Sequence, residues 1–225
     1  VSGESEVRCL FDAGNSLSNS LECIPSKKEN YESAVYSKDN FVYLSAEHIG
    51  PQRKYDYSKW NMEGINKFGN RGEYAVPFLA MNGDRTVVPD ELCIYDSATR
   101  TNKLIDQVSA WMGKISPGIR LNTELLAGDQ EARLTISYNE DWFVSSNNSP
   151  INVGFGIPYV LPIIVALLTI NEGSIILIEN PESHLHPKGQ TAMAELMARA
   201  AACGAQIICE SHSDHIINGV RVCVK

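Results

Sequence analysis

The sequence predicts an α/β fold with a parallel sheet in the last third of the chain. After Pro150, segments with the patterns of helices and strands alternate, at 156–170, 174–179, 188–202, 205–210 and 212–221. This alternation is typical of parallel strands joined by helices. Before it, three segments separated by turn residues have the pattern of antiparallel strands, at 118–126, 131–139 and 141–146. We therefore expect a mixed, partly antiparallel β region over 1–150 and a parallel α/β lobe over 151–225.

The upstream region also contains shorter elements. Candidate strands occur at 6–11 and 20–25, and a buried strand is expected over Phe41–Ser45. The segment 73–82 suggests a short helix. Over Asn102–Ile115 the apolar residues recur at helical spacing, which predicts an amphipathic helix.

Composition limits the possible classes of protein. The chain has 225 residues, is 44% apolar and carries a net charge of −8, so it can build a core but has no broad basic surface for nucleic acid. Its six cysteines form no CxxC pair; Cys203 and Cys209 lie in apolar surroundings and predict reduced core residues of a cytoplasmic protein. Glycines and prolines crowd the first half of Ile151–Ile170, which favours a buried helix over a membrane span.

Two apolar segments end in polar clusters. "IILIENPESHLHPKGQ", Ile175–Gln190, runs from a strand into Glu179 and then two histidines, and the next strand ends in Glu210 followed by "SHSDH". Functional residues gather at the carboxyl ends of parallel strands, so the two clusters are expected to face one crevice. A divalent cation such as Mg²⁺ prefers carboxylates and water there, and a histidine can hydrogen-bond a phosphoryl oxygen.

The combination of motifs resembles a known family. Asn152–Arg221 resembles the second half of an ATP-binding-cassette-type ATPase head, and more specifically the SMC/RecF/OLD-like AAA group of P-loop ATPases, which includes bacterial ATPases linked to anti-phage defence. In that resemblance, 152–168 is the signature loop and its helix, 175–182 the Walker B strand, 183–190 the D-loop and 207–221 the switch-histidine motif.

The resemblance implies roles for individual residues. Glu179 stands at the Mg²⁺-supporting acid, and Asn180 stands where many cassette ATPases have a catalytic glutamate, so Glu182 is expected to activate water. His212 matches the switch histidine near the γ-phosphate. The remaining implied nucleotide-contacting or partner-contacting positions are Gly154, Phe155, Gly156, His184 and His186. Pro158 and Tyr159 replace the Ser-Gln pair that the family usually has after its signature loop.

The phosphate cradle of such ATPases, GxxxxGK[ST], does not occur in these 225 residues. We therefore expect ATP and Mg²⁺ to require a Walker A lobe, and this chain alone to be inactive. The family further implies a head-to-head homodimer that sandwiches nucleotide. DNA, a nuclease or a toxin are open as partners.

Two other interpretations remain. A metal-dependent hydrolase could use Glu182, His184, His186, His212 and His215 as ligands. Alternatively, Asn180, Pro158 and Tyr159 would suit a degenerate ATPase lobe that serves as a non-catalytic interaction module. Tight, stoichiometric binding of zinc to the purified chain would favour the hydrolase interpretation.

Overall fold

The computed structural model describes residues 9–12, 22–25, 40–57, 67–96, 99–126, 130–140, 143–144, 148–154 and 156–224. The chain divides into two compact units, Val1–Ser37 and Lys38–Lys225. In the first, β1 (Cys9–Asp12) pairs with β2 (Glu22–Pro25) in antiparallel register, which confirms the two strands expected there.

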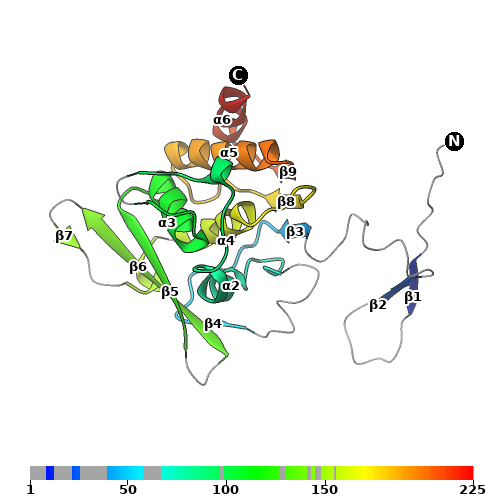
Figure 1. The fold of residues 1–225 in the computed structure, drawn as a ribbon, viewed down its shortest axis with the longest axis horizontal. Coiled ribbons are helices and arrows are strands. Elements are labelled where there is room, and N and C mark those ends of the chain that lie inside the picture. Colours follow the sequence, from blue (N-terminus) through cyan, green and yellow to red (C-terminus); the bar gives the residue numbers. More distant parts are fainter. Residues whose placement is uncertain are drawn as a thin grey trace. The chain divides into compact units, whose positions relative to one another are not determined.

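The second unit contains a parallel sheet in the order β3 (Phe41–Leu44), β8 (Ile175–Glu179) and β9 (Gln206–Glu210) (Figure 1). The central strand β8 pairs on both sides: Leu44 lies opposite Ile178, and Glu179 lies opposite Glu210. The register therefore places the carboxyl ends of β8 and β9 at one edge of the sheet, as the sequence predicted. The division into domains over 1–150 and 151–225 stays a prediction, and β3 from the upstream part is a strand of this sheet.

An antiparallel sheet forms the other side of this unit. Its order is β4 (Tyr55–Asp56), β6 (Glu131–Glu140) and β5 (Ile119–Leu125), and β7 (Phe143–Val144) pairs with the far end of β6. Buried residues alternate along β6, with Ala132, Leu134 and Ile136 facing the core. Period-two burial of this kind is what holds the register of an antiparallel pair.

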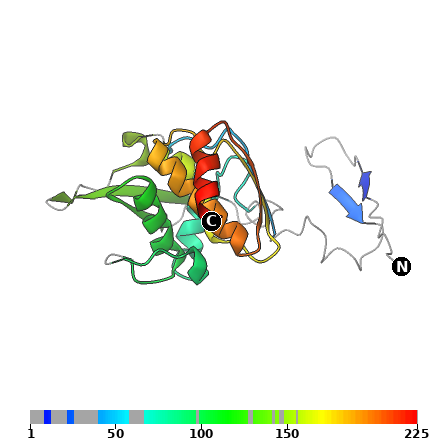
Figure 2. The ribbon, with the colours of Figure 1, turned by 90° about the horizontal axis from the view of Figure 1, so that it is seen from above.

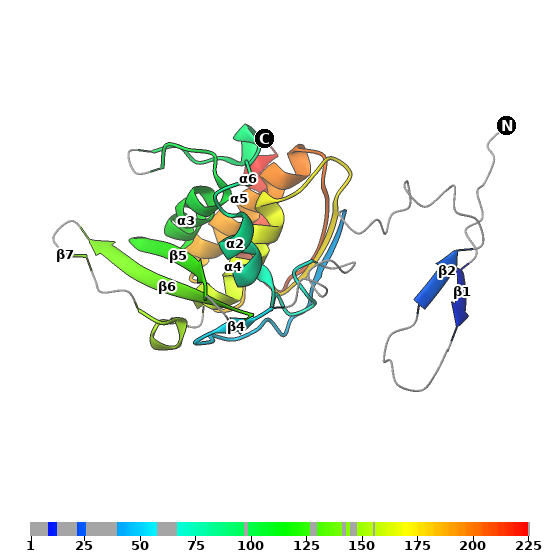
Figure 3. The same cartoon turned by 60° about the horizontal axis from the view of Figure 1, so that its bottom comes forward.

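Helices fill the space between the two sheets. Figure 3 shows α2 (Ala75–Asn82), α3 (Leu104–Ile115) and α4 (Gly156–Leu168) between the parallel sheet and the β5–β6 pair. α5 (Pro187–Ala202) connects β8 to β9, and α6 (Asp214–Cys223) packs against α5 (Figure 2). Two short 3₁₀ helices, η2 (Asp90–Leu92) and η3 (Pro150–Asn152), also occur in the described residues.

Helix α4 is the centre of the core. Eleven of its 13 residues are buried, which explains why its sequence is apolar on every side. Gly72 has a φ of 75°, and a Cβ there would lie 2.4 Å from Pro162 of α4, so this close approach needs glycine. In the described residues, no helix is both long and apolar enough to cross a membrane.

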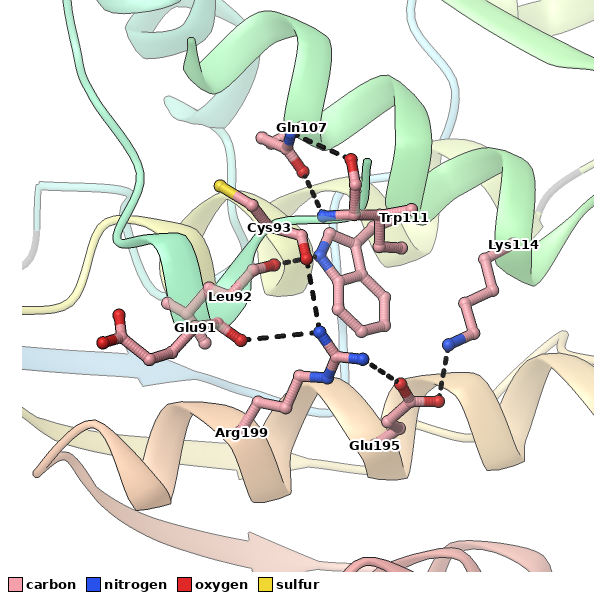
Figure 4. Close-up of polar contacts among 9 residues, drawn as sticks. Glu91, Leu92, Cys93, Gln107, Trp111, Lys114, Glu195 and Arg199 are labelled. Carbon is pink, nitrogen blue, oxygen red and sulfur yellow. Dashed lines mark hydrogen bonds and ion pairs between the residues drawn. The ribbon is translucent and has the colours of Figure 1, made fainter. Parts of the chain in front are cut away.

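Polar contacts around Trp111 link α3 with α5 (Figure 4). The indole Nε1 of Trp111, which is fully buried, donates to the carbonyl of Leu92 at 2.8 Å. Arg199 of α5 stacks over the same ring and donates to Glu195, which also accepts from Lys114 of α3 at 2.6 Å. The ion pairs of Glu195 with Lys114 and Arg199 therefore help to hold α3 and α5 together.

The last strand and the last helix are much more open than the rest of the unit. Along β9 only Ile207 is partly buried, and Ile208 is 49% exposed. The expectation that Cys203 and Cys209 are core residues is therefore wrong for Cys209, which is exposed, and only partly right for Cys203, which is half-buried. The apolar neighbours of Cys209 in sequence lie on a strand that is paired on one side only within the described sheet.

Candidate functional site

Glu179 ends strand β8 and is held by the neighbouring strand. Its Oε1 accepts a hydrogen bond from the Tyr43 hydroxyl at 2.8 Å, and its Oε2 accepts from the Ala46 backbone N–H at 2.8 Å. The Ala46 N–H, followed by the Tyr43 hydroxyl, lowers the pKa of the Glu179 carboxyl below its usual value. Glu179 is therefore a fixed, ionised carboxylate at the edge where the sequence predicted a metal-supporting acid.

Glu182 joins the two polar clusters. One carboxylate oxygen accepts from the Ser211 hydroxyl at 2.8 Å, and the other accepts from the His212 backbone N–H at 2.7 Å. A third link is the Asn180 N–H, which donates to the Glu210 carbonyl at 2.9 Å. The structure thus brings together the segments after β8 and β9, as expected, and shows that Glu182 positions the backbone of the predicted switch histidine.

The imidazole of His212 points away from the core. Its side chain is 77% exposed, and its Nε2 lies 3.7 Å from Oε1 of Glu210, which is itself 62% exposed. A contact as exposed as this one is weak in water. The side chain is consequently accessible to a ligand at the sheet edge, while its backbone is held by Glu182.

Two residues in the turn after β8 have left-handed backbone conformations. Asn180 has a φ of 49° and His184 a φ of 61°, which are uncommon for residues other than glycine. The Oδ1 atom of Asn180 is buried without a hydrogen-bond partner among the described residues. An unsatisfied buried acceptor costs stability, and such residues cluster at functional sites.

The predicted signature loop and D-loop meet at a cavity of about 250 Å³. Gly154 and Gly156 line it from one side and His184 and His186 from the other, with residues of α3 and Tyr138 completing the wall. A Cβ on Gly156 would lie only 2.7 Å from the His184 carbonyl oxygen, whereas nothing lies within 4 Å of one on Gly154. Phe155, between them, lies outside the described residues.

Sequence reasoning missed a group of aromatic residues behind these loops. His48 is 5% exposed, and its Nδ1–H donates to the Tyr159 carbonyl at 2.8 Å. The Tyr159 ring lies 4.3 Å from the His48 ring and 5.1 Å from the His184 ring, centroid to centroid, and its hydroxyl donates to the Ala46 carbonyl. Ala46 also donates to Glu179. Tyr159 therefore connects the signature helix with the residues that hold Glu179.

Burial lowers the pKa of His48, although the Tyr159 carbonyl and the charge of Glu179 oppose that effect. The Tyr159 carbonyl can only accept, so Nδ1 carries the proton of the neutral ring. Nε2 is buried and has no partner among the described residues. No local pattern in the sequence pointed to His48, because Tyr159, which it contacts, lies 111 residues away.

Comparison with known proteins gives a family match for the last part of the chain. Residues 129–218 match the family described as "AAA domain, putative AbiEii toxin, Type IV TA system". This segment contains Gly154, Glu179, Glu182, His184 and His212. The segment with the predicted motifs therefore matches an AAA domain, and the predicted resemblance to the AAA group of ATPases is confirmed for these residues.

Among solved structures, the chain is similar to "Crystal structure of the SmcHead bound to the C-winged helix domain of ScpA" at 13% identity and a TM-score of 0.40. The match covers 50% of this chain and 35% of that one, so the chain spans about a third of that relative. A likeness at this level carries no conclusion about activity. No protein with a curated description matches the sequence.

Proposed function

We propose that this chain supplies the Walker B, signature, D-loop and switch elements of an ATP-hydrolysing SMC-like head. The observation that carries the proposal is the register of β8 and β9, with Glu179 opposite Glu210, and the bridge from Glu182 to Ser211 and His212. Carboxylates and a reachable histidine at the carboxyl edge of a parallel sheet suit a nucleotide with a divalent cation. A phosphate cradle would have to come from another segment.

The residues at this edge fit Mg²⁺ through its water ligands. Each oxygen of Glu179 already accepts one hydrogen bond. This suits Mg²⁺, because the ion keeps several water ligands and needs few protein carboxylates. Glu179 would orient the hydrated ion, whose role is to neutralise phosphate charge. Asn180 follows Glu179 directly, but its Oδ1 is buried and would reach this water shell only if its side chain turned.

The base that activates water is assigned to Glu182 in this proposal, and its two hydrogen bonds make a specific test possible. In a polypeptide that also carries a phosphate cradle, Glu182→Gln should lower turnover by about 10²-fold with nucleotide binding retained. Ser211→Ala is the matched variant, because it removes one bond to Glu182 and keeps the carboxylate. Equal losses of turnover in both variants would mean that Glu182 positions His212 and is not the base. Wild-type turnover in Glu182→Gln would instead indicate that Asn180 holds the attacking water.

For the 225 residues alone, the expected result is no ATP turnover and no tight Mg-ATP binding. Isothermal calorimetry that gave a micromolar dissociation constant lost in Glu179→Gln would contradict this. About 8 kcal/mol would then come from this edge without a cradle.

We further propose that nucleotide is sandwiched in a two-fold dimer, each site completed by the partner's Gly154–Tyr159 loop. The test is light scattering with ATP on a cradle-containing Glu182→Gln protein. Gly154→Asp is the suitable disruptive change, because a side chain at 154 meets nothing within its own chain and Gly156 touches His184. An ATP-dependent dimer that Gly154→Asp abolishes and Gly154→Ala retains supports the sandwich. A mass unaffected by ATP favours a non-catalytic module.

The metal-hydrolase alternative finds no support in the geometry, since no cluster of three or more His, Cys, Asp or Glu suited to a metal ion occurs within the described ranges. A DNA or nuclease partner, a role in anti-phage defence and a cytoplasmic location stay predictions.

A further inference from the structure

A second cavity, of about 510 Å³, lies at the antiparallel sheet. Three cationic side chains, Arg53, Lys54 and Arg133, line it, and none of the described residues in its lining is acidic. The chain as a whole carries a net charge of −8, so this cavity departs in sign from the average surface. Its volume lies in the range of small-molecule sites.

The cations come from two elements that the fold holds together. Arg53 and Lys54 directly precede β4, and Arg133 lies on β6, where Ala132 is the register partner of Tyr55. Lys54 pairs with Glu131, and Arg133 pairs with Glu124 at 3.1 Å, both at partly exposed positions. Exposed pairs of this kind are weak, so an anion with several charges competes with them. In the described part of the chain, Arg53 has no carboxylate within ion-pair distance.

Hydroxyl and apolar groups complete the cavity. The Ser149 Oγ is buried and has no hydrogen-bond partner within the described residues, although it lines a cavity with three cations. A hydroxyl that lacks an acceptor suits a phosphoryl oxygen. Ile151 is 40% exposed and adds an apolar wall beside the charges, whereas Leu134 is fully buried and offers a ligand no free surface.

We propose that this cavity binds a small phosphate ester of about mononucleotide size. Arg53, Lys54 and Arg133 would hold its phosphate, with Ser149 donating one hydrogen bond, and Ile151 would contact its apolar or planar part. Arginine suits this role because its planar fork matches phosphate oxygens.

The cavity also adjoins the segments that serve the candidate ATPase site. Ser149 and Asn152 belong to the turn that leads into Gly154, and Ile136 of β6 exchanges backbone hydrogen bonds with Asn148. Arg53 follows the segment that contains Ala46 and His48. A ligand held by Arg53 and Ser149 would therefore connect both segments and restrict their relative movement.

The experiment is calorimetric titration of the 225-residue chain at low salt with AMP, with inorganic pyrophosphate and with a short single-stranded oligonucleotide. AMP is expected to bind, and Arg53→Gln to weaken it by about 10-fold or more without lowering the melting temperature, because one charge-assisted contact is lost. Arg85→Gln, which makes the same charge change at an exposed position outside the cavity, is the matched control. Ser149→Ala should raise the dissociation constant of AMP about 3- to 10-fold.

Three results would overturn the proposal: no AMP binding up to about 10 mM, equal losses in Arg53→Gln and Arg85→Gln, or binding of the oligonucleotide alone. Pyrophosphate binding without any preference for AMP would reject the apolar contacts. Binding that survives Glu179→Gln separates this cavity from the ATPase edge, so either proposal can fail without the other.

Discussion

Strands β8 and β9 have nearly the same sequence pattern but very different surroundings. Each is an apolar strand that ends in glutamate, and the two glutamates are register partners. Yet Ile178 of β8 is 1% exposed and Ile208 of β9 is 49% exposed. Glu179 accepts hydrogen bonds from Tyr43 and Ala46, whereas Glu210 lies in the open beside His212.

Ile178 and Ile208 lie on opposite faces of the sheet, because Ile208 is the register partner of Leu177, and the two strands also differ in their number of neighbours. β8 pairs with β3 and β9, and β9 pairs with β8 alone in the described sheet. A parallel strand is normally covered on both faces, whereas β9 leaves Ile208 about half exposed in the described residues. Position in the sheet, rather than strand sequence, leaves one carboxylate held by hydrogen bonds and the other without them.

The largest expected effect concerns the two isoleucines. Ile178→Ala should lower the free energy of unfolding by about 2–5 kcal/mol because it opens a cavity in the core. Ile208→Ala should cost about 1 kcal/mol or less, since half of its side chain is already in water. Urea unfolding followed by circular dichroism measures both. Equal losses would show that β9 is covered in solution, for example by self-association.

The glutamates provide the next test. Glu179→Gln should cost about 1–2 kcal/mol, because a neutral amide oxygen is a weaker acceptor for the Ala46 N–H than a carboxylate, and the amide nitrogen cannot accept from the Tyr43 hydroxyl. Glu210→Gln should stay within about 0.5 kcal/mol of wild type. Tyr43→Phe serves as a control that removes only one of the two bonds to Glu179. If Glu210→Gln proved the more destabilising, the contrast between the strands would be reversed.

The smallest expected effect is a pH dependence. The folded protein lowers the pKa of Glu179, so its contribution is fully present above the pKa of the unfolded chain, near 4.3. It is lost as the pH falls through the lower folded pKa. The stability difference between wild type and Glu179→Gln should thus shrink between about pH 5 and pH 3. A difference that grew on acidification would mean that the carboxyl is neutral in the fold.

The order of elements could be predicted from the sequence because it depends on local periodicity. The helices at 104–115 and 156–168, the strands at 175–179 and 206–210 and the antiparallel strands all form near the expected residues. The meeting of the clusters after Glu179 and Glu210 also followed from a general property of parallel sheets. These inferences need only neighbouring residues and a common fold rule.

The contacts that shape the site could not be predicted in this way. Tyr43 lies 136 residues from Glu179, and Ala46 lies 133 residues from it, so no local pattern links them. The same is true of His48 and Tyr159. Tyr159 stood out in the sequence only as a departure from the family, while the structure gives it two hydrogen bonds and two ring contacts. Cys209 was misplaced because apolar neighbours do not reveal that a strand lies at an edge.

The close approach of Gly156 to the His184 carbonyl has a consequence for the way related sequences are interpreted. A side chain at 156 would displace its own chain's backbone before any ligand arrived. The requirement for glycine at 156 therefore arises from packing within the chain. An invariant glycine at this position in an alignment would be no sign of nucleotide contact. Gly154 is under no such restraint, so selection at 154 would report on whatever approaches from outside.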